Sequence, residues 1–427
     1  MSDFKPVLLA LPSLTPSLAV EILPRGLTIH RIFVQEGGRT HDIVVGPEKP
    51  EDHLRNKYTN TLIGRYTNRL PVGTHSIERK IKEDEIACKI NITAKNEGDT
   101  ASLHGGAQGF DSLPLTLLSS SSESTLFTKA ELISLATHIP GESSSSIWRL
   151  VSEDGDQGFP GQLTVEVLVA LKEGSGSKRV EGDWEELALG SIIIVYRARV
   201  QGKNCKPVVT PINLTQHWGF NLDASLEKKD PSVLKHSLIV KASHTIERDA
   251  DDLPTGNLLP VAGAHVHNGK KIEEGFPSGG YDDFYMFSKP ALSVKRINLS
   301  DITKTSVDLL EPILSSSGET ESVVELSSDE SGLRLTFSTN QTGVQFYSNN
   351  YASPGGGTRK KIHGGSGNVG DGYGPGSAAF LEFHEPLAAF LFPQFQKNKD
   401  DTLLASDEVY HNFVKVDVAV RHLAPAV

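Results

Sequence analysis

The sequence predicts an all-β protein, built as one large antiparallel β-sandwich with few short helices. Apolar and polar residues alternate in many short stretches, such as residues 163–171, 191–200 and 414–420. Glycine and proline, with 39 and 23 residues, separate these stretches as turns do. Helical periodicity is scarce, and the strands do not alternate with helices as they would in a parallel sheet. Together these three observations favour a sandwich of antiparallel strands.

The composition is that of a soluble, acidic globular protein. Of the 427 residues, 37% are hydrophobic and 22% are charged, and the formal net charge is −11. This charge argues against nucleic acid or an anionic membrane as a partner. No apolar run approaches the roughly 18 residues that a membrane helix needs. Because large sandwiches often form one domain, we expect a single domain over residues 1–427.

In chain order, two strands are expected within residues 17–35, joined by a Pro-Arg-Gly turn, and another at 42–46. Residues 172–190 separate two strands by more than a hairpin connection, so we expect a solvated surface insertion there. The glycine-rich residues 353–377 predict a second insertion, either a mobile rim of a site or a disordered loop. The chain ends in the strand at 414–420.

Cysteine usage and the N-terminus bear on the compartment. Cys88 and Cys205 are the two cysteines, which excludes a disulfide framework. Neither has a CxxC partner or a neighbouring histidine, so no metal site is predicted. The short apolar run near the N-terminus is broken by Pro6 and Pro12 and lacks a clear cleavage site. These features favour the cytoplasm but leave secretion open.

The chain is organised around residues 210–222, a polar and partly β-branched strand near its middle. At period two, one face carries Ile212 and Leu214, and the other carries Asn213 and His217. Asn213 begins one of four glycosylation sequons, and a glycan there would block any ligand at His217, which again favours the cytoplasm. A single histidine in a strand is most often a satisfied sheet residue. A functional role for His217 therefore requires partners from elsewhere in the chain.

The pattern T-P-x-N-L-T-x-H-x-x-F-N-L of residues 210–222 resembles the corresponding strand of the aldose 1-epimerase (galactose mutarotase) family. Other motifs of that family follow in its order, from about residue 18 to about residue 420. They are G-R-x-x-N-R at 64–69, L-H-G-G-x-x-G-F-D at 103–111, D-G-x-x-G-F-P-G at 154–161, P-T-G at 254–256, G-Y-D at 280–282, G-V-Q-F-Y at 343–347 and L-E at 381–382. The resemblance implies the family's sandwich, with a site on its concave sheet.

The resemblance also implies an acid/base pair with supporting residues. Glu382 matches the family's catalytic base, His217 matches its acid, and His104 would assist at the ring oxygen. A carboxylate on the otherwise apolar strand at 378–383 is costly to bury unless it is used or paired. Amide and guanidinium donors in fixed planes suit hydroxyl recognition. The positions that match the family's substrate-binding residues are Asn68, Arg69, Asp282 and Gln345.

Two departures from the family pattern stand next to these residues. Asp283 follows Asp282 where the family has His-Asn, so this loop is one residue shorter. After Glu382, residues 384–393 replace the family's N-x-P-D-A-x-N-x-P, which we interpret as a changed rim of the site.

The implied reaction is interconversion of the anomers of an aldose. It requires removal of the C1 hydroxyl proton and protonation of the ring oxygen, so that the ring opens to the aldehyde and recloses. To donate at neutral pH, His217 must be protonated for a useful fraction of the time, which a nearby carboxylate would favour. The resemblance thus implies a mutarotase of carbohydrate metabolism that acts on a free aldohexose such as glucose or galactose. We expect no metal or organic cofactor, and a monomer or weak dimer.

Two alternatives remain open. A non-catalytic sugar-binding or sensor protein on the same fold would keep the cleft but would need no acid/base pair. A hexose-6-phosphate 1-epimerase would need arginines clustered at the cleft, and the candidates are Arg65, Arg69 and Arg359.

Overall fold

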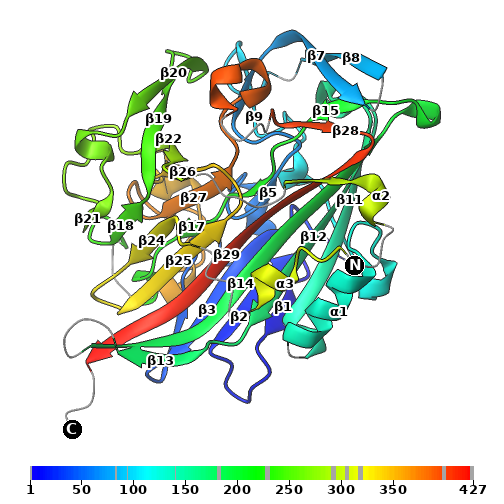
Figure 1. Cartoon of the computed structure of the whole chain (residues 1–427). Helices are drawn as coiled ribbons and strands as arrows, with labels where there is room; N and C mark the ends of the chain where they lie inside the picture. The colour runs from blue at the N-terminus through cyan, green and yellow to red at the C-terminus, as the bar shows by residue number, and fades with distance from the viewer. Residues whose placement is uncertain are drawn as a thin grey trace.

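The fold is built almost entirely of antiparallel strands (Figure 1), which confirms the predicted class. The computed structural model describes residues 2–81, 84–93, 95–139, 141–179, 184–226, 231–289, 295–302, 307–315, 321–396 and 401–423. In these ranges, none of the helices combines the length and the hydropathy of a membrane span.

The larger of the two main sheets has eleven strands in the described part of the chain and is centred on its two longest strands. From edge to edge these are β10 (Thr116–Leu117), β11 (Ser145–Ser152), β12 (Gln162–Lys172), β14 (Trp184–Gln201), β29 (Glu408–Leu423), β25 (Leu333–Thr339), β24 (Val324–Ser327), β18 (Ser237–Val240) and β21 (Asn268–Lys271). In addition, β13 (Gly176–Arg179) pairs with β14, and β23 (Arg296–Asn298) pairs with β29. The long β14–β29 pair runs diagonally across the molecule (Figure 1).

The second main sheet has six strands among the described residues and carries the site discussed below. Its order is β17 (Gly219–Phe220), β27 (Ala379–His384), β26 (Gly343–Tyr347), β22 (Asp282–Phe287), β19 (Ala242–Arg248) and β20 (Pro254–Pro260). Neighbouring strands are antiparallel, with Gln345 of β26 directly opposite Glu382 of β27. Cross-strand neighbours of this kind share one face of a sheet.

Smaller sheets complete the structure. A four-stranded sheet contains β1 (Val7–Ala10), β2 (Leu18–Leu23), β3 (Thr28–Glu36) and β4 (Arg39–Asp42). The two strands expected within residues 17–35 are β2 and β3, whereas the stretch at 42–46 contributes the last residue of β4 and a bridge between Val44 and Phe220. The two-stranded pairs are β5 (Leu62–Ile63) with β16 (Thr215–Gln216), β6 (Arg69–Pro71) with β9 (Ala101–Leu103), β7 (Gly73–Ile81) with β8 (Asp84–Ile92), and β15 (Val209–Pro211) with β28 (Leu403–Ala405).

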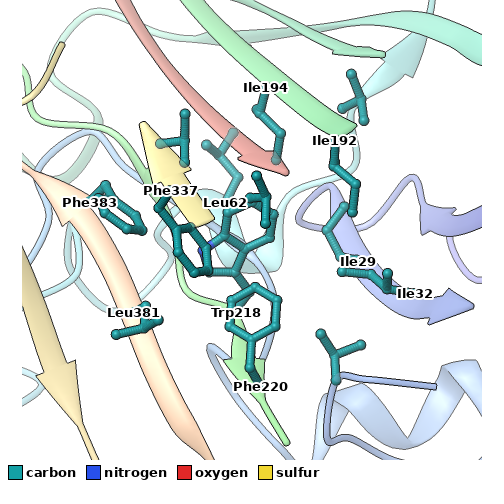
Figure 2. Packing of buried hydrophobic residues seen from close by; sticks show 14 of the residues in the cluster. Ile29, Ile32, Leu62, Ile192, Ile194, Trp218, Phe220, Phe337, Leu381 and Phe383 are labelled. Atoms are coloured by element: carbon teal, nitrogen blue, oxygen red, sulfur yellow. The ribbon is translucent and has the colours of Figure 1, made fainter. Parts of the chain in front are cut away.

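The two main sheets enclose a hydrophobic core that is rich in aromatic rings. Phe337 of β25 stacks on Phe383 of β27 with ring centroids 5.1 Å apart, and Trp218 lies 5.2 Å from Phe220. Figure 2 shows these rings packed beside Leu381 and the isoleucines of β14. Burial of each such side chain contributes about 1.5–3 kcal/mol. Because side chains alternate along a strand, β27 must turn its other residues toward the opposite face of its sheet.

The outer face of the larger sheet is covered by short helices. α1 (Lys129–His138) begins with a capping box, in which Thr128 and Glu131 satisfy each other's backbone N–H groups. Leu135 of α1 packs with α3 (Glu311–Leu314) against Ile193 and other outward residues of the sheet. Both faces of β14 are therefore buried, which explains its long apolar run. The remaining α-helix of the described residues is α2 (Leu299–Ile302).

The central stretch 210–222 differs from the half-buried strand that its alternation predicts. It forms the short strands β15, β16 and β17, and every residue from 208 to 225 is buried. The chain passes through the interior, so the amides of Asn213, Gln216 and Asn221 donate to backbone carbonyls instead of to water. Asn213 is fully buried: its amide donates to the carbonyl of Glu385 (2.9 Å) and its Oδ1 accepts the N–H of the same residue (3.0 Å). This sequon is unavailable for a glycan in the folded protein.

The two predicted insertions have different structures. Within residues 172–190, β13 folds back on the first half of β14 as an exposed hairpin, while residues 180–183 lie outside the described part. Residues 353–377 contribute to the lining of the pocket, contain η9 (Pro354–Gly356) and η10 (Lys361–His363), and pack on the sandwich through buried side chains.

Lys360 anchors the 353–377 segment to the sandwich. Its fully buried ammonium lies 2.8 Å from Asp42 Oδ2 and donates to the carbonyls of His30 and Val44, each at 2.7 Å. Burial lowers the pKa of Lys360 to about 8, against the raising effect of Asp42. The three N–H donors of the ammonium are thus all used, and the segment is held by a buried, fully bonded ion pair.

We expect Lys360→Met to lower the free energy of unfolding by about 3–5 kcal/mol, because it leaves the buried carboxylate of Asp42 without its main partner. The matched control is Lys361→Met at the neighbouring exposed position, which should change little. Urea unfolding followed by fluorescence measures both. Equal stabilities for the two variants would refute the anchoring role.

Candidate active site

A pocket of about 480 Å³ opens on the face of the six-stranded sheet that points away from the core. Strand alternation explains this placement: Leu381 and Phe383 of β27 enter the core, while Phe380 and Glu382 line the pocket. The pocket brings together all seven residues singled out from the sequence, namely Asn68, Arg69, His104, His217, Asp282, Gln345 and Glu382.

His217 and Glu382 are in direct contact. His217 lies between β16 and β17, and its backbone is fixed by bonds to Thr61 (2.9 Å) and Asn60 (2.8 Å). Because β17 pairs with β27, the imidazole Nε2 comes to 3.2 Å from Glu382 Oε1. The second carboxyl oxygen, Oε2, and the second imidazole nitrogen, Nδ1, are buried without a partner among the described residues. A buried carboxyl oxygen without a partner is costly, and it indicates a place for a ligand hydroxyl.

Burial sets the charge state of this pair. Desolvation, followed by the negative charge of Asp282, raises the pKa of Glu382 well above its usual value. Desolvation lowers the pKa of His217 to about 4. Burial therefore favours the neutral form of both groups, which face each other across the 3.2 Å contact. Burial thus acts against the protonated His217 that donation to a ligand would require, and the carboxyl of Glu382 is the neighbouring group that would favour it.

His104 is held as a neutral hydrogen-bond donor. Its Nδ1 accepts the backbone N–H of Asn68 at 3.2 Å, so its proton must be on Nε2. Burial, reinforced by His217 and Arg69, keeps the pKa of His104 well below its usual value. Its ring stands 5.2 Å from that of His217 at an interplanar angle of 89°. The following Gly105 has φ +85°, and a Cβ there would lie 1.9 Å from the carbonyl oxygen of Gly64, so only glycine fits this turn.

The other predicted residues form a hydrogen-bonded chain along one wall. Asn68 Nδ2 donates to Gln345 Oε1 (3.3 Å), and Gln345 Nε2 donates to Asp282 Oδ1 (2.7 Å). Arg69 lies beside them, paired with Glu97 at 3.0 Å and near Asp252 at 3.7 Å. Amide and carboxylate groups ordered in this way present fixed donors and acceptors to the hydroxyls of a ligand.

Arg248 of β19 and Phe380 of β27 belong to the site but were missed in the sequence. Arg248 donates to the carbonyl of Asp282, and its Nη1 lies 3.7 Å from Asp282 Oδ2 and 3.2 Å from Asp252 Oδ1. No sequence signal marks this arginine as part of the site, since Asp282, which it contacts, lies on another strand. Phe380 lies 5.0 Å from the His217 ring. A signal did exist for Phe380, because the alternation that turns Glu382 outward turns Phe380 to the same face.

The two departures from the family pattern lie beneath the pocket. Asp283 is directed away from it, 3.8 Å from His265, so the shorter loop leaves Asp282 in place. The segment after Glu382 is not a changed rim, because residues 384–389 are all buried. His384 Nδ1 bonds the carbonyl of Glu385 at 2.6 Å, and the Glu385 carboxylate pairs with Lys295 at 2.7 Å. This segment supports β27 from below.

His104, His217 and Glu382 are near enough to hold a metal ion, since their ligand atoms lie within 4.8 Å of one another. The surrounding hydrogen bonds do not fit this use. A metal-ligating histidine normally donates its other ring N–H to an acceptor. His104 instead accepts a backbone N–H on Nδ1, which leaves the proton on the nitrogen that would face the metal. The donor set therefore suits proton transfer and hydrogen bonding better than metal binding.

Of the three arginines considered for a phosphate-binding site, two lie outside the pocket, although Arg55 and Lys57 line it as well. Arg65 is 2% exposed and donates to Ser152, Glu153 and Pro160, away from the pocket. Arg359 pairs with Asp371 at 3.1 Å and does not line the pocket. Of the three candidates, only Arg69 reaches the pocket, where carboxylates already neutralise it.

Comparison with known proteins finds similar proteins of one family. The family model described as aldose 1-epimerase matches residues 195–382. The chain is 27% identical over 342 residues to a galactose mutarotase of Sus scrofa, covering 78% of this chain and 75% of that protein. It is 27% identical over 341 residues to a galactose mutarotase of Homo sapiens, with the same coverage, and 26% identical over 357 residues to a probable aldose 1-epimerase of Arthroderma benhamiae, covering 78% and 67%.

Solved structures show the same fold. An aldose epimerase homologue from C. elegans superposes with a TM-score of 0.66 at 17% identity, covering 97% of this chain and 99% of the other. A galactose 1-epimerase from Lactobacillus acidophilus NCFM gives a TM-score of 0.61 at 16% identity, covering 97% and 98%.

We expect the buried His217 to make the protein less stable in acid. A histidine whose pKa is lowered in the folded state contributes stability that is present above its unfolded pKa of 6.5 and is lost as the pH falls through its folded pKa of about 4. In His217→Gln this loss, on the order of 2–3 kcal/mol, should disappear.

The measurement is the free energy of unfolding of both proteins at several pH values between 4 and 7. Because other buried histidines titrate in the same direction, only the difference between wild type and variant is informative. His138→Gln, at the end of α1, is the control and should follow the wild type. A difference between wild type and His217→Gln that does not change with pH would contradict the burial argument.

Proposed function

Because this chain belongs to the aldose 1-epimerase family, we propose that it interconverts the α and β anomers of a free aldohexose such as glucose or galactose, with Glu382 as base and His217 as acid. The proposed roles of these two residues rest on the contact between them, which is 3.2 Å long. Both residues line a pocket whose other polar groups suit the binding of hydroxyls.

The two oxygens that exchange protons in this reaction are bonded to the same carbon, C1 of the sugar. An acid and a base in contact with each other can therefore serve both oxygens with little movement. In the reactive arrangement Glu382 is ionised and His217 is protonated. The carboxylate takes the proton of the C1 hydroxyl, the imidazolium gives its proton to the ring oxygen, and the C1–ring-oxygen bond breaks to leave the aldehyde. Rotation about the C1–C2 bond and reversal of the steps give the other anomer.

Burial favours the proton transfers that accompany ring opening. Ring opening converts the ionised pair into the neutral pair, which is the form that desolvation favours at both residues. Sugar hydroxyls that bond the unpartnered Oε2 of Glu382 would stabilise the ionised form on binding. The bound sugar would thus offset part of the cost of the ionised pair, which the neutral pair of the closing step does not carry.

His104 supports the step without changing its own charge. Its Nε2–H, fixed by the bond from Asn68 to Nδ1, donates a hydrogen bond to the oxygen on which negative charge develops. Asn68, Arg69, Asp282 and Gln345 bind the remaining hydroxyls and hold the ring in one pose. A binding protein without turnover would not need the buried acid/base pair, whose burial is costly.

Glu382→Gln should lower the rate of mutarotation about 10²- to 10⁴-fold toward the spontaneous rate, because the amide cannot accept the hydroxyl proton. Polarimetry on freshly dissolved α-glucose and α-galactose gives the rates. Glu51→Gln, at an exposed position, is the control. No acceleration by wild-type protein would favour the sugar-binding alternative, and acceleration only with glucose 6-phosphate would favour a hexose-phosphate epimerase.

Arg248→Gln should raise KM by roughly tenfold while kcat changes much less, because this arginine holds Asp282 and does not reach the reacting atoms. Steady-state polarimetry over a range of galactose concentrations separates the two constants. A roughly tenfold fall of kcat with KM unchanged would exclude a positioning role for Arg248.

A further inference from the structure

A turn at residues 57–61 fixes the backbone of His217. The N–H of Asn60 donates to the His217 carbonyl at 2.8 Å, and the N–H of His217 donates to the Thr61 carbonyl at 2.9 Å. The turn is closed by the carbonyl of Tyr58, which accepts the N–H of Thr61 at 3.1 Å and its hydroxyl at 2.9 Å. The acid of the proposed pair is therefore held by the segment that also carries Tyr58.

The side chains of the same turn hold the loop that carries His104. The Tyr58 hydroxyl accepts a hydrogen bond from Asn96 Nδ2 at 3.3 Å. Asn96 in turn bonds the backbone of Leu103, accepting its N–H at 2.8 Å and donating to its carbonyl at 2.9 Å. Lys57 Nζ donates to a carbonyl of this loop at 3.2 Å. One turn thus connects the two imidazoles of the site, which come from distant parts of the chain.

The ring of Tyr58 contacts both imidazoles. Its centroid lies 4.8 Å from that of His104 at an interplanar angle of 65°, and 6.4 Å from that of His217 at 37°. These distances are typical of attractive aromatic pairs. Tyr58 also has φ +70°, a conformation that a bulky residue adopts only when the surrounding structure requires it. The position of the ring is thus set by its turn and by its contacts together.

Tyr58 also stands between the pocket and a second, smaller cavity of about 110 Å³. Tyr58 and Lys57 line both spaces, and the far side of the small cavity carries Asp111. His104 and His217 are only 6% and 8% exposed although they line an open pocket. Loss of the Tyr58 ring would join the two spaces and let water reach both imidazoles from a second side.

We propose that Tyr58 is a positioning residue of the site, whose ring holds His104 and His217 in place and excludes water from them. The inference rests on the proposed function, because it concerns the two imidazoles that serve the sugar there. Tyr58 itself transfers no proton. Desolvation raises the pKa of its phenol above the ordinary value, so the hydroxyl stays protonated near neutral pH.

Water access is the quantity that this ring controls. Desolvation is the leading cause of the low pKa at both His104 and His217. The charged and titratable groups that act on this cluster are Glu382, Asp282, Arg69, His384 and Lys57. Tyr58 adds no charge to them. Removal of its ring therefore changes hydration and alignment but leaves these charges in place.

The test compares wild type with Tyr58→Ala and Tyr58→Phe by histidine NMR, with His217→Gln to assign the His217 signal. In Tyr58→Ala the apparent pKa of His217 should rise from about 4 toward the ordinary 6.5, because water reaches the ring. In polarimetry on glucose, kcat should fall about tenfold with KM within about twofold, because the imidazoles lose their alignment. Tyr58→Phe keeps the ring and should restore both the pKa and most of kcat.

The control is Leu54→Ala, an exposed position in the preceding segment, which should follow the wild type. Thermal unfolding shows whether Tyr58→Ala folds, and Tyr58→Leu, which fills more of the space, replaces it if it does not. An unchanged pKa of His217 in the variant without the ring would refute the inference. A loss of kcat in Tyr58→Phe as large as in Tyr58→Ala would also refute it, because the hydroxyl would then be the group that matters.

The NMR titration does not depend on turnover, so it separates this inference from the proposed function. If wild type fails to accelerate the mutarotation of glucose, the proposed function is overturned. The pKa of His217 then still decides whether the ring of Tyr58 keeps water from the two imidazoles.

Discussion

A carboxyl and an imidazole held together away from water are the constraint on which the rest of the site depends. In water Glu382 would be ionised and His217 would be largely neutral near pH 7, and the two would act independently. Burial moves the pKa of the acid up and that of the base down, so the neutral form of each is favoured. The neighbouring rings of Phe380 and His104 and the core beneath β27 maintain this dry environment.

The sandwich supplies the rigidity that such a pair needs. Glu382 and Gln345 are cross-strand neighbours in the middle of a six-stranded sheet, and the core rings on the far face of that sheet fix both strands. His217 lies on a stretch that passes through the interior, where backbone bonds to Thr61 and Asn60 fix its position. Side chains on strands and in the interior hold their positions more precisely than side chains on loops. The proposed reaction requires this precision, because two oxygens on one carbon must each contact a different residue, one the base and the other the acid.

The part of the pocket that departs most from a simple strand scaffold is its outer wall. The 353–377 segment has little regular structure, but the buried pair of Lys360 with Asp42 ties it to the sandwich. This anchoring holds Ser353, Gly356 and Gly357 at the pocket. The lining of the pocket is thus held by different means, a sheet beneath the acid/base pair and an anchored segment beside it.

The sequence by itself determined the sandwich class, the outward face of β27 and the seven polar residues that meet in the pocket. Alternation and turn residues are local signals that can be read from sequence neighbours. The motifs of the resembled family pointed to the polar side chains, one of which stands on an otherwise apolar strand. Only the tertiary structure decided that residues 208–225 are buried on both faces. It also placed residues 384–389 beneath the site and not at its rim, and it brought Arg248 to Asp282. The same packing favours the neutral form of His217 beside its carboxyl. The reason is that burial, and with it pKa and hydrogen-bond partners, depends on which distant segments pack around a residue, and no pattern of sequence neighbours contains that information.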